Sequence, residues 1–213
     1  GAHEKLLTAF REKKADVLLG TQMIAKGLDF PDVTLVGVIA ADTVLNLPDF
    51  RAAERTFQLL TQVGGRAGRH ARPGRVVIQT YNPEHYSIEM AANYAATAFY
   101  RKECQARMKK HYPPFCSLIA IKFSHPDQAT VMRASQRMTD ALKQCLPREA
   151  EVLGPVRAPV FRARDRYRMQ TMIKYKGGKD LSTAINRARK TAEASFPAGD
   201  LRIVIDRDPY VLL

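Results

Sequence analysis

The chain has 213 residues, 46% of them hydrophobic, and a formal net charge of +13. That length suits one large or two small globular domains, and no apolar run approaches the roughly 18 residues of a membrane span, so we expect no membrane partner. The excess of Lys and Arg favours a polyanionic partner instead. Cys104, Cys116 and Cys145 are far apart and form no CxxC pair, which excludes a disulfide framework and a cysteine metal site. With no secretory leader in view, we expect a cytoplasmic protein.

Three short apolar runs predict buried strands in the first half of the chain: residues 17–19, 35–41 and 75–80. Helical or irregular stretches separate these runs, and this alternation predicts a parallel α/β layer. Gly20 ends the first strand. Beyond the carboxyl end of that strand, where ligands bind in open α/β sheets, the sequence places a hydroxyl, an amide and an ammonium group. These belong to Thr21, Gln22 and Lys26.

The segment 62–69 places two arginines, Arg66 and Arg69, on one face of a helix or helix-like turn. The glycines around them leave room for a backbone or a bound phosphate to approach. Arginine carries a permanent charge and a forked set of donors that suits phosphate oxygens, as an arginine finger requires. Taken alone, the pair favours a plainer alternative, a surface turn with two solvated arginines. The stretch at 17–31 favours the phosphate interpretation.

The organisation changes near residue 113. Residues 84–111 contain neither Pro nor Gly and predict one long helix, which Pro113 and Pro114 stop because proline lacks the amide donor and restricts its predecessor. We therefore expect one domain over 1–113 and a second over 114–213.

The second domain has the predicted element order β-α-β-β-α-β. The expected elements are a strand at 118–123, a helix at 128–146, strands at 151–161 and 167–176, a helix at 180–196 and a strand at 201–206. This order predicts an α+β split βαβ sandwich with both helices on one face of the sheet. The fold is common and does not by itself indicate a function.

Basic residues are concentrated in this second domain. Residues 114–213 carry 18 Lys and Arg against 10 Asp and Glu, a net +8, and residues 157–179 hold eight basic residues and one acidic residue. Such a run predicts a surface that follows phosphates, with salt-dependent binding. A merely solvated face is the alternative. The strands at 151–161 and 167–176 form a hairpin joined by a charged turn at 162–166. The candidate DNA-binding side chains in this turn and on the second of these strands are Arg162, Arg164, Arg166, Arg168, Lys174 and Lys176.

The order of the 17–31 and 62–69 stretches resembles motifs V and VI of superfamily 2 helicases, in the second RecA-like lobe. Residues 42–62 (DTVLNLPDFRAAERTFQLLTQ), the YPPF run at 112–115 and the closing residues 205–210 resemble the PriA family of replication-restart helicases, over nearly the whole chain. The resemblance implies a partial RecA-like helicase lobe 2 followed by a ribosomal S10-like carboxy-terminal domain.

The resemblance also implies residue roles. Arg66 and Arg69 correspond to the catalytic motif VI arginines that reach the γ-phosphate of ATP. The implied nucleotide-side contacts are Gln62, Gly27 and Asp29, and the implied DNA-backbone contacts near motif V are Thr21, Gln22 and Lys26. No catalytic role is assigned to the neighbouring charged residues Asp42, Asp49, Glu54 and Arg55, for which structural ion pairs are an equal interpretation.

The implied activity is that of an ATP-dependent 3′-to-5′ DNA helicase that recognises stalled or branched forks and restarts replication by primosome assembly. Its cofactors are ATP and magnesium, and its partners are branched or single-stranded DNA, single-strand-binding protein and other primosome proteins. The chain has no GxxxxGK[ST] phosphate loop, no DExH-type run and none of the family's zinc-binding cysteine pairs. We therefore expect the chain alone neither to hydrolyse ATP nor to unwind DNA. A non-unwinding translocase and a free-standing nucleic-acid-binding module of ribosomal type stay open.

Overall fold

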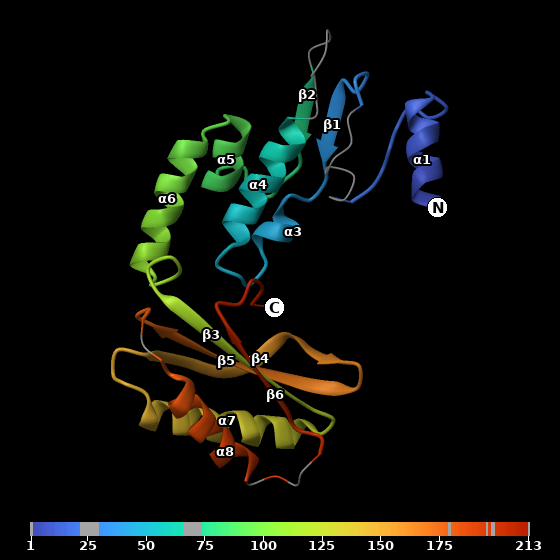
Figure 1. The fold of residues 1–213 in the computed structure, drawn as a ribbon. Coiled ribbons are helices and arrows are strands. Elements are labelled where there is room, and N and C mark those ends of the chain that lie inside the picture. Colours follow the sequence, from blue (N-terminus) through green and yellow to red (C-terminus); the bar gives the residue numbers. More distant parts are fainter. Residues whose placement is uncertain are drawn as a thin grey trace. The chain divides into compact units, whose positions relative to one another are not determined.

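The structure, a computed structural model, describes residues 2–21, 30–65, 74–178, 180–194, 196 and 199–212. The chain forms two compact units (Figure 1). Unit 1 comprises Gly1–Leu47 and Arg51–Glu103, and unit 2 comprises Pro48–Phe50 and Cys104–Leu213. The boundary expected at residue 113 stays a prediction about which parts fold separately.

Unit 1 contains a parallel pair of strands with helices beside it. Its elements are α1 (Ala2–Arg11), β1 (Leu35–Val38), α3 (Asp42–Leu45), α4 (Ala52–Gly64), β2 (Arg75–Ile78), α5 (Tyr86–Ala92) and the first part of α6 (Ala96–Lys109). The two strands run side by side in register, from the pair Leu35 and Arg75 to the pair Val38 and Ile78. The predicted parallel layer is therefore confirmed for these strands, each shorter than expected.

The strand predicted at residues 17–19 is wrong. These residues have no regular secondary structure, and the side chains of Val17 and Leu19 are 80% and 81% exposed. Among the described residues, β1 and β2 pair only with each other, and residues 17–19 add no third strand to this pair. A strand keeps its apolar side chains buried only when neighbouring strands and a covering layer exist, which three apolar letters do not provide.

The single long helix predicted over 84–111 is also wrong, because the chain forms α5 and α6 with a break at residues 93–95. Asn93 caps α5, and Tyr94 adopts a left-handed conformation with φ +51°. Asparagine is accepted at helix ends, so the absence of Pro and Gly did not guarantee continuity. The break allows Phe99 of α6 to stack on Phe57 of α4, with ring centroids 4.0 Å apart, in the core of unit 1.

The two glycines at the end of α4 have different surroundings. A Cβ atom at Gly64 would lie 2.6 Å from the hydroxyl oxygen of Tyr94, whereas one at Gly65 would lie no closer than 3.7 Å to a carbonyl oxygen. The space expected here for a phosphate or a backbone is thus taken, at Gly64, by a tyrosine side chain.

Alanine should therefore act differently at these two positions. We expect Gly65→Ala to keep or raise the free energy of unfolding by up to about 1 kcal/mol, because its backbone φ of −72° suits alanine. We expect Gly64→Ala to lower it by about 1 kcal/mol through overpacking against Tyr94. Thermal unfolding of both variants, each with and without Tyr94→Ala, measures this. A Gly64→Ala penalty that persists without the tyrosine ring would contradict the explanation.

Unit 2 is a four-stranded antiparallel sheet with two helices on one face. Its elements, after the end of α6, are β3 (Ser117–His125), α7 (Gln128–Cys145), β4 (Glu151–Ala163), β5 (Arg166–Tyr175), α8 (Ser182–Glu193) and β6 (Arg202–Arg207). The strand order is β4-β5-β3-β6, and every neighbouring pair is antiparallel. Figure 1 shows α7 and α8 together on one face of this sheet. The predicted split βαβ sandwich is confirmed.

The helix-facing side of this sheet carries the core. Alternate residues of β3 and β5 point toward the helices because side chains alternate along a strand. The buried cluster consists of Ile119, Ile121, Phe123, Val131, Met138, Leu142, Met169, Ile173, Tyr175, Leu181, Ile185, Ala188, Ala192 and Ile203. Within it the hydroxyls of Thr139 and Thr171 are hydrogen bonded at 2.7 Å, which satisfies both buried polar groups. The opposite face of the sheet carries the basic side chains.

Candidate functional site

The structure describes only part of the predicted ATP-side group. Gln22, Lys26, Gly27, Asp29, Arg66 and Arg69 lie outside the described residues. Thr21 is exposed in an irregular segment, and Gln62 is half-buried in the last turn of α4, two residues before that helix ends at Gly64. The roles expected for this group stay predictions.

Asp42 joins the carboxyl ends of the two parallel strands of unit 1. It opens α3 just after β1, and its carboxylate accepts hydrogen bonds from the Thr80 hydroxyl (2.8 Å) and the Tyr81 backbone N–H (2.9 Å), just after β2. These bonds, chiefly the one from Tyr81, hold the pKa of Asp42 below its usual value. The two loops that begin the ligand-binding edge of such a sheet are thereby fixed together. An aspartate after one strand and a threonine after the next were the sequence signals for this contact.

Unit 1 should lose stability in acid through this group. The pKa of Asp42 in the folded state lies below its ordinary value of 3.8, so its contribution is present above about pH 4 and is lost as pH falls through the folded pKa. We expect Asp42→Asn to lower the unfolding temperature at pH 7, and the difference from the wild type to shrink below pH 4. Unfolding scans between pH 3 and pH 7 test this, with Asp16→Asn as the exposed control. A difference that does not depend on pH would contradict it.

A tight hairpin presents the predicted DNA-binding side chains in unit 2. β4 and β5 are joined by Arg164 and Asp165, which both have positive φ, 50° and 55°. Two such residues in succession form a primed turn, whose twist matches that of the strands. The hairpin predicted from the sequence is confirmed, and its turn is shorter than the expected residues 162–166.

Two arginines near this turn lie against aromatic rings. The guanidinium of Arg157 lies 4.6 Å from the ring centre of Phe161, and that of Arg162 lies 5.3 Å from the ring centre of Tyr167. The two rings are 5.3 Å apart and tilted by 56°. Arg162 also pairs with Asp165 at 3.3 Å. Cation–π contacts restrict the conformations of long side chains, so these two guanidinium groups are held against the rings.

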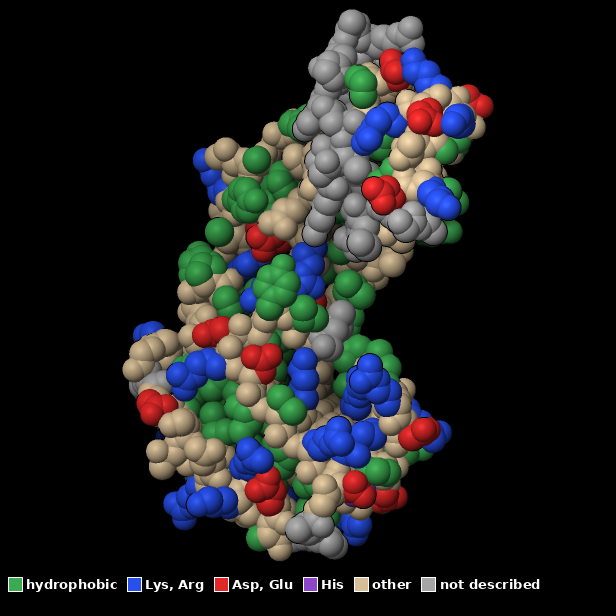
Figure 2. Space-filling model, turned by 45° about the vertical axis from the view of Figure 1, so that its right-hand side comes forward, with side chains coloured by type: hydrophobic (Ala, Val, Ile, Leu, Met, Phe, Trp, Pro, Cys, Tyr) green, Lys and Arg blue, Asp and Glu red, His purple; other side chains and the backbone are tan. Residues whose placement is uncertain are grey.

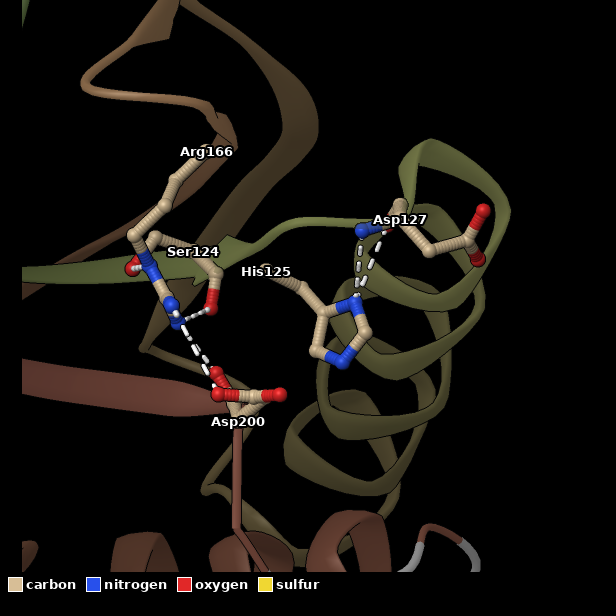
Figure 3. Close-up of polar contacts among 5 residues, drawn as sticks. All are labelled: Ser124, His125, Asp127, Arg166 and Asp200. Atoms are coloured by element: carbon tan, nitrogen blue, oxygen red, sulfur yellow. Dashed lines mark hydrogen bonds and ion pairs between the residues drawn. The ribbon is translucent and has the colours of Figure 1, made fainter.

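Two of the six predicted DNA-binding side chains are engaged inside the unit. The side chain of Arg166 is 16% exposed and donates to the hydroxyl and carbonyl oxygens of Ser124 and to the carbonyl oxygen of Asp200 (Figure 3). Lys174 is buried, and its ammonium group donates to the Lys110 carbonyl at 3.1 Å. Both side chains hold segments of unit 2 together.

The other four predicted residues have more exposed side chains. Arg168 is half-buried on the sheet face away from the helices, and Arg162, Arg164 and Lys176 are exposed. Figure 2 shows Lys and Arg side chains spread over the visible face of unit 2, with some Asp and Glu between them. The arrangement suits contact with a charged backbone, because the exposed positive charges are spread along the hairpin and beyond its end.

Comparison with known proteins accounts for both halves of the chain. Residues 1–71 match the family described as Helicase conserved C-terminal domain, and residues 109–210 match the Primosomal protein N C-terminal domain. The chain is 48% identical over its whole length to the replication restart protein PriA of Bacillus subtilis, covering 26% of that protein. It is 40% identical over 98% of its length to the PriA protein of Synechocystis, covering 24%. This chain belongs to the PriA family.

Each of the two matched domains contains one of the two candidate sites. The chain spans about a quarter of the length of the curated PriA relatives that it matches. Its helicase match includes Gln62 and the segment with Arg66 and Arg69, and its primosomal match includes the whole β4–β5 hairpin. The alternative of a free-standing ribosomal-type module is not favoured, because the PriA relatives match the full chain and its first third matches a helicase domain.

In the described part of the chain, no group of three or more His, Cys, Asp or Glu side chains could hold a metal ion. None of the helices described here is long and apolar enough to cross a membrane.

Proposed function

We propose that this chain is the carboxy-terminal part of an ATP-dependent 3′-to-5′ DNA helicase that recognises stalled or branched forks and restarts replication by primosome assembly. The observation that carries the proposal is the succession, in one PriA-family chain, of a helicase C-terminal domain and a primosomal C-terminal domain with a basic hairpin.

On the ATP side, Arg66 and Arg69 stabilise the charge that develops on the transferred phosphoryl group. Gln62, Gly27 and Asp29 contact the nucleotide side, and Thr21, Gln22 and Lys26 contact the DNA backbone. The position of Gln62 in the last turn of α4, just before the arginine segment, supports its grouping with those arginines. The sequence of this chain lacks the phosphate loop, so we assign ATP and magnesium binding to the full-length enzyme. Zinc likewise belongs to the cysteine pairs of the full-length family.

On the DNA side, unit 2 holds the phosphate backbone through Arg162, Arg164, Arg168 and Lys176. Arg166 and Lys174 keep the hairpin and its neighbours in position. Contacts to phosphates carry no sequence information, so DNA binding by this unit is salt-dependent and indifferent to base sequence. The comparison of unit 2 with ribosomal protein S10 is part of this proposal and rests on its split βαβ topology.

The partners follow from the restart function: branched or single-stranded DNA, single-strand-binding protein and other primosome proteins, in the cytoplasm. The names of the relatives support the replication-restart part of this assignment.

The test is phosphate release and strand separation on a forked duplex. We expect the full-length protein to hydrolyse ATP in a DNA-dependent manner and to move 3′ to 5′, and the 213-residue chain alone to do neither. DNA-stimulated turnover by the isolated chain, or its absence in the full-length protein, would refute the proposal. ATP hydrolysis that moves along DNA without separating strands would identify the translocase alternative.

A further inference from the structure

Three residues of the helicase half are built into the other unit. Pro48–Phe50 lie in sequence between α3 and α4, which belong to unit 1, but their contacts place them in unit 2. Asp49 is buried, with 7% of its surface exposed, and its carboxylate accepts a hydrogen bond from the backbone N–H of Leu212 at 3.5 Å. The segment is therefore held by residues from the far end of the chain.

An aromatic stack with a cation at each end holds Phe50. Its ring is parallel to that of Tyr112, with centroids 4.9 Å apart and planes 8° apart. Arg107, near the end of α6, lies 5.0 Å from the centre of the Phe50 ring, and Lys174 of β5 lies 4.1 Å from the centre of the Tyr112 ring. Cations over ring faces and offset parallel rings are both attractive, so the four side chains form one connected contact.

Lys174 connects this stack to the basic hairpin. Its ammonium group also donates to the Lys110 carbonyl and lies 3.9 Å from the Glu151 carboxylate at the start of β4. On β5, Arg168 and Lys174 point to the same face of the sheet, because they are six residues apart on a strand. Lys174 thus connects the strand that carries Arg168 to the stack.

On its other side, the segment leads into α4. α4 begins at Ala52, two residues after Phe50, so the backbone of the segment continues directly into the first turn of this helix. The helix then runs 13 residues, about 20 Å, to Gly64 and carries Gln62 in its last turn. α4 therefore links the segment to a residue of the ATP side.

We propose that Pro48–Phe50 couple DNA binding by unit 2 to the ATP side of the helicase through α4, with Phe50 and Tyr112 as positioning residues. This inference rests on the proposed function. DNA bound on the hairpin changes the position of the stack, and the stack changes the position of the first turn of α4. Through α4 this shift reaches Gln62 and the arginine segment. Because coupling is reciprocal, the nucleotide state also changes DNA affinity.

The test uses the full-length protein with Phe50→Ala, the conservative variant Phe50→Tyr, and Tyr81→Ala as a control, since Tyr81 is a 94% exposed aromatic residue of unit 1. We expect Phe50→Ala to keep basal ATP hydrolysis and fork-DNA affinity but to lower the DNA stimulation of hydrolysis about tenfold. Phe50→Tyr and Tyr81→Ala should keep the stimulation. Hydrogen exchange in residues 52–65 should change on addition of DNA to the wild type and not to Phe50→Ala.

The outcomes separate the two claims. Absence of DNA-stimulated hydrolysis in the wild type refutes the proposed function, and the exchange response of α4 then decides the coupling by itself. Full stimulation and a full exchange response in Phe50→Ala overturn the coupling while the helicase function stands. If Phe50→Ala lowers the unfolding temperature, Tyr112→Leu, which removes the stack from the other side, must give the same loss of stimulation.

Discussion

Replacing Arg66 and Arg69 together by alanine in the full-length protein is expected to lower the kcat of ATP hydrolysis by about 10³-fold or more, with fork-DNA affinity retained. Both residues lie outside the described part of the structure, so the expectation rests on their spacing and on the helicase match. The physical reason is that the charge on the transferred phosphoryl group grows in the transition state, where a fixed guanidinium stabilises it most.

Two comparisons sharpen this experiment. Arg75→Ala removes one exposed arginine of β2 and should leave hydrolysis unchanged. Arg66→Lys and Arg69→Lys keep the charge but lose the forked donors, so they should recover little activity if the contact is bidentate. Hydrolysis within threefold of wild type in the double alanine variant would return the pair to a solvated surface turn.

Neutralising Arg162, Arg164 and Arg168 with glutamine should weaken fork-DNA binding and flatten its salt dependence. Each phosphate contact contributes roughly one unit to the slope of log affinity against log salt, so the triple variant should lose about three. The loss of affinity should be uniform across DNA sequences, because no base is read. Fluorescence anisotropy from 50 to 300 mM salt measures both quantities. Arg166 and Lys174 stay intact because their contacts hold the unit together.

The matched control removes the same net charge from the helix side of the unit. Arg133, Arg137 and Lys143 are exposed on α7, and their replacement by glutamine should change the slope much less. Equal losses in the two triple variants would show that only net charge matters. Unchanged affinity in the hairpin variant would identify the basic strands as a solvated face.

Much of unit 2 could be read from the sequence. Alternation along β3 and β5 and the stripe on α7 both follow from local periodicity, and a strand or helix that buries one face against a core shows that periodicity in its letters. The errors fell in unit 1. Residues 17–19 are apolar but have no described strand beside them, and a helix break needed only an asparagine and a left-handed tyrosine. Neither partner strands nor a helix end at Asn93 can be inferred from local composition.

The charge pattern alone could not predict which of the six candidate DNA-binding residues have exposed side chains. Spacing on a strand assigns each to a face, but whether a cation is exposed depends on what other segments lie over it. Arg166 meets Ser124 and Asp200, and Lys174 meets residues of the segment that follows α6, all distant in sequence.

By itself, the sequence determined the PriA family, the split βαβ order of the second unit and the arginine pair, because motif spacing and periodicity are local properties of the chain. The tertiary structure decided which hairpin charges are exposed, that Asp42 joins two strand ends, and that Phe50 stacks in the C-terminal unit. Those features are contacts between segments separated by 34 residues or more, from Arg166 and Asp200 at 34 to Lys174 and Lys110 at 64. Such contacts exist only once the chain has folded.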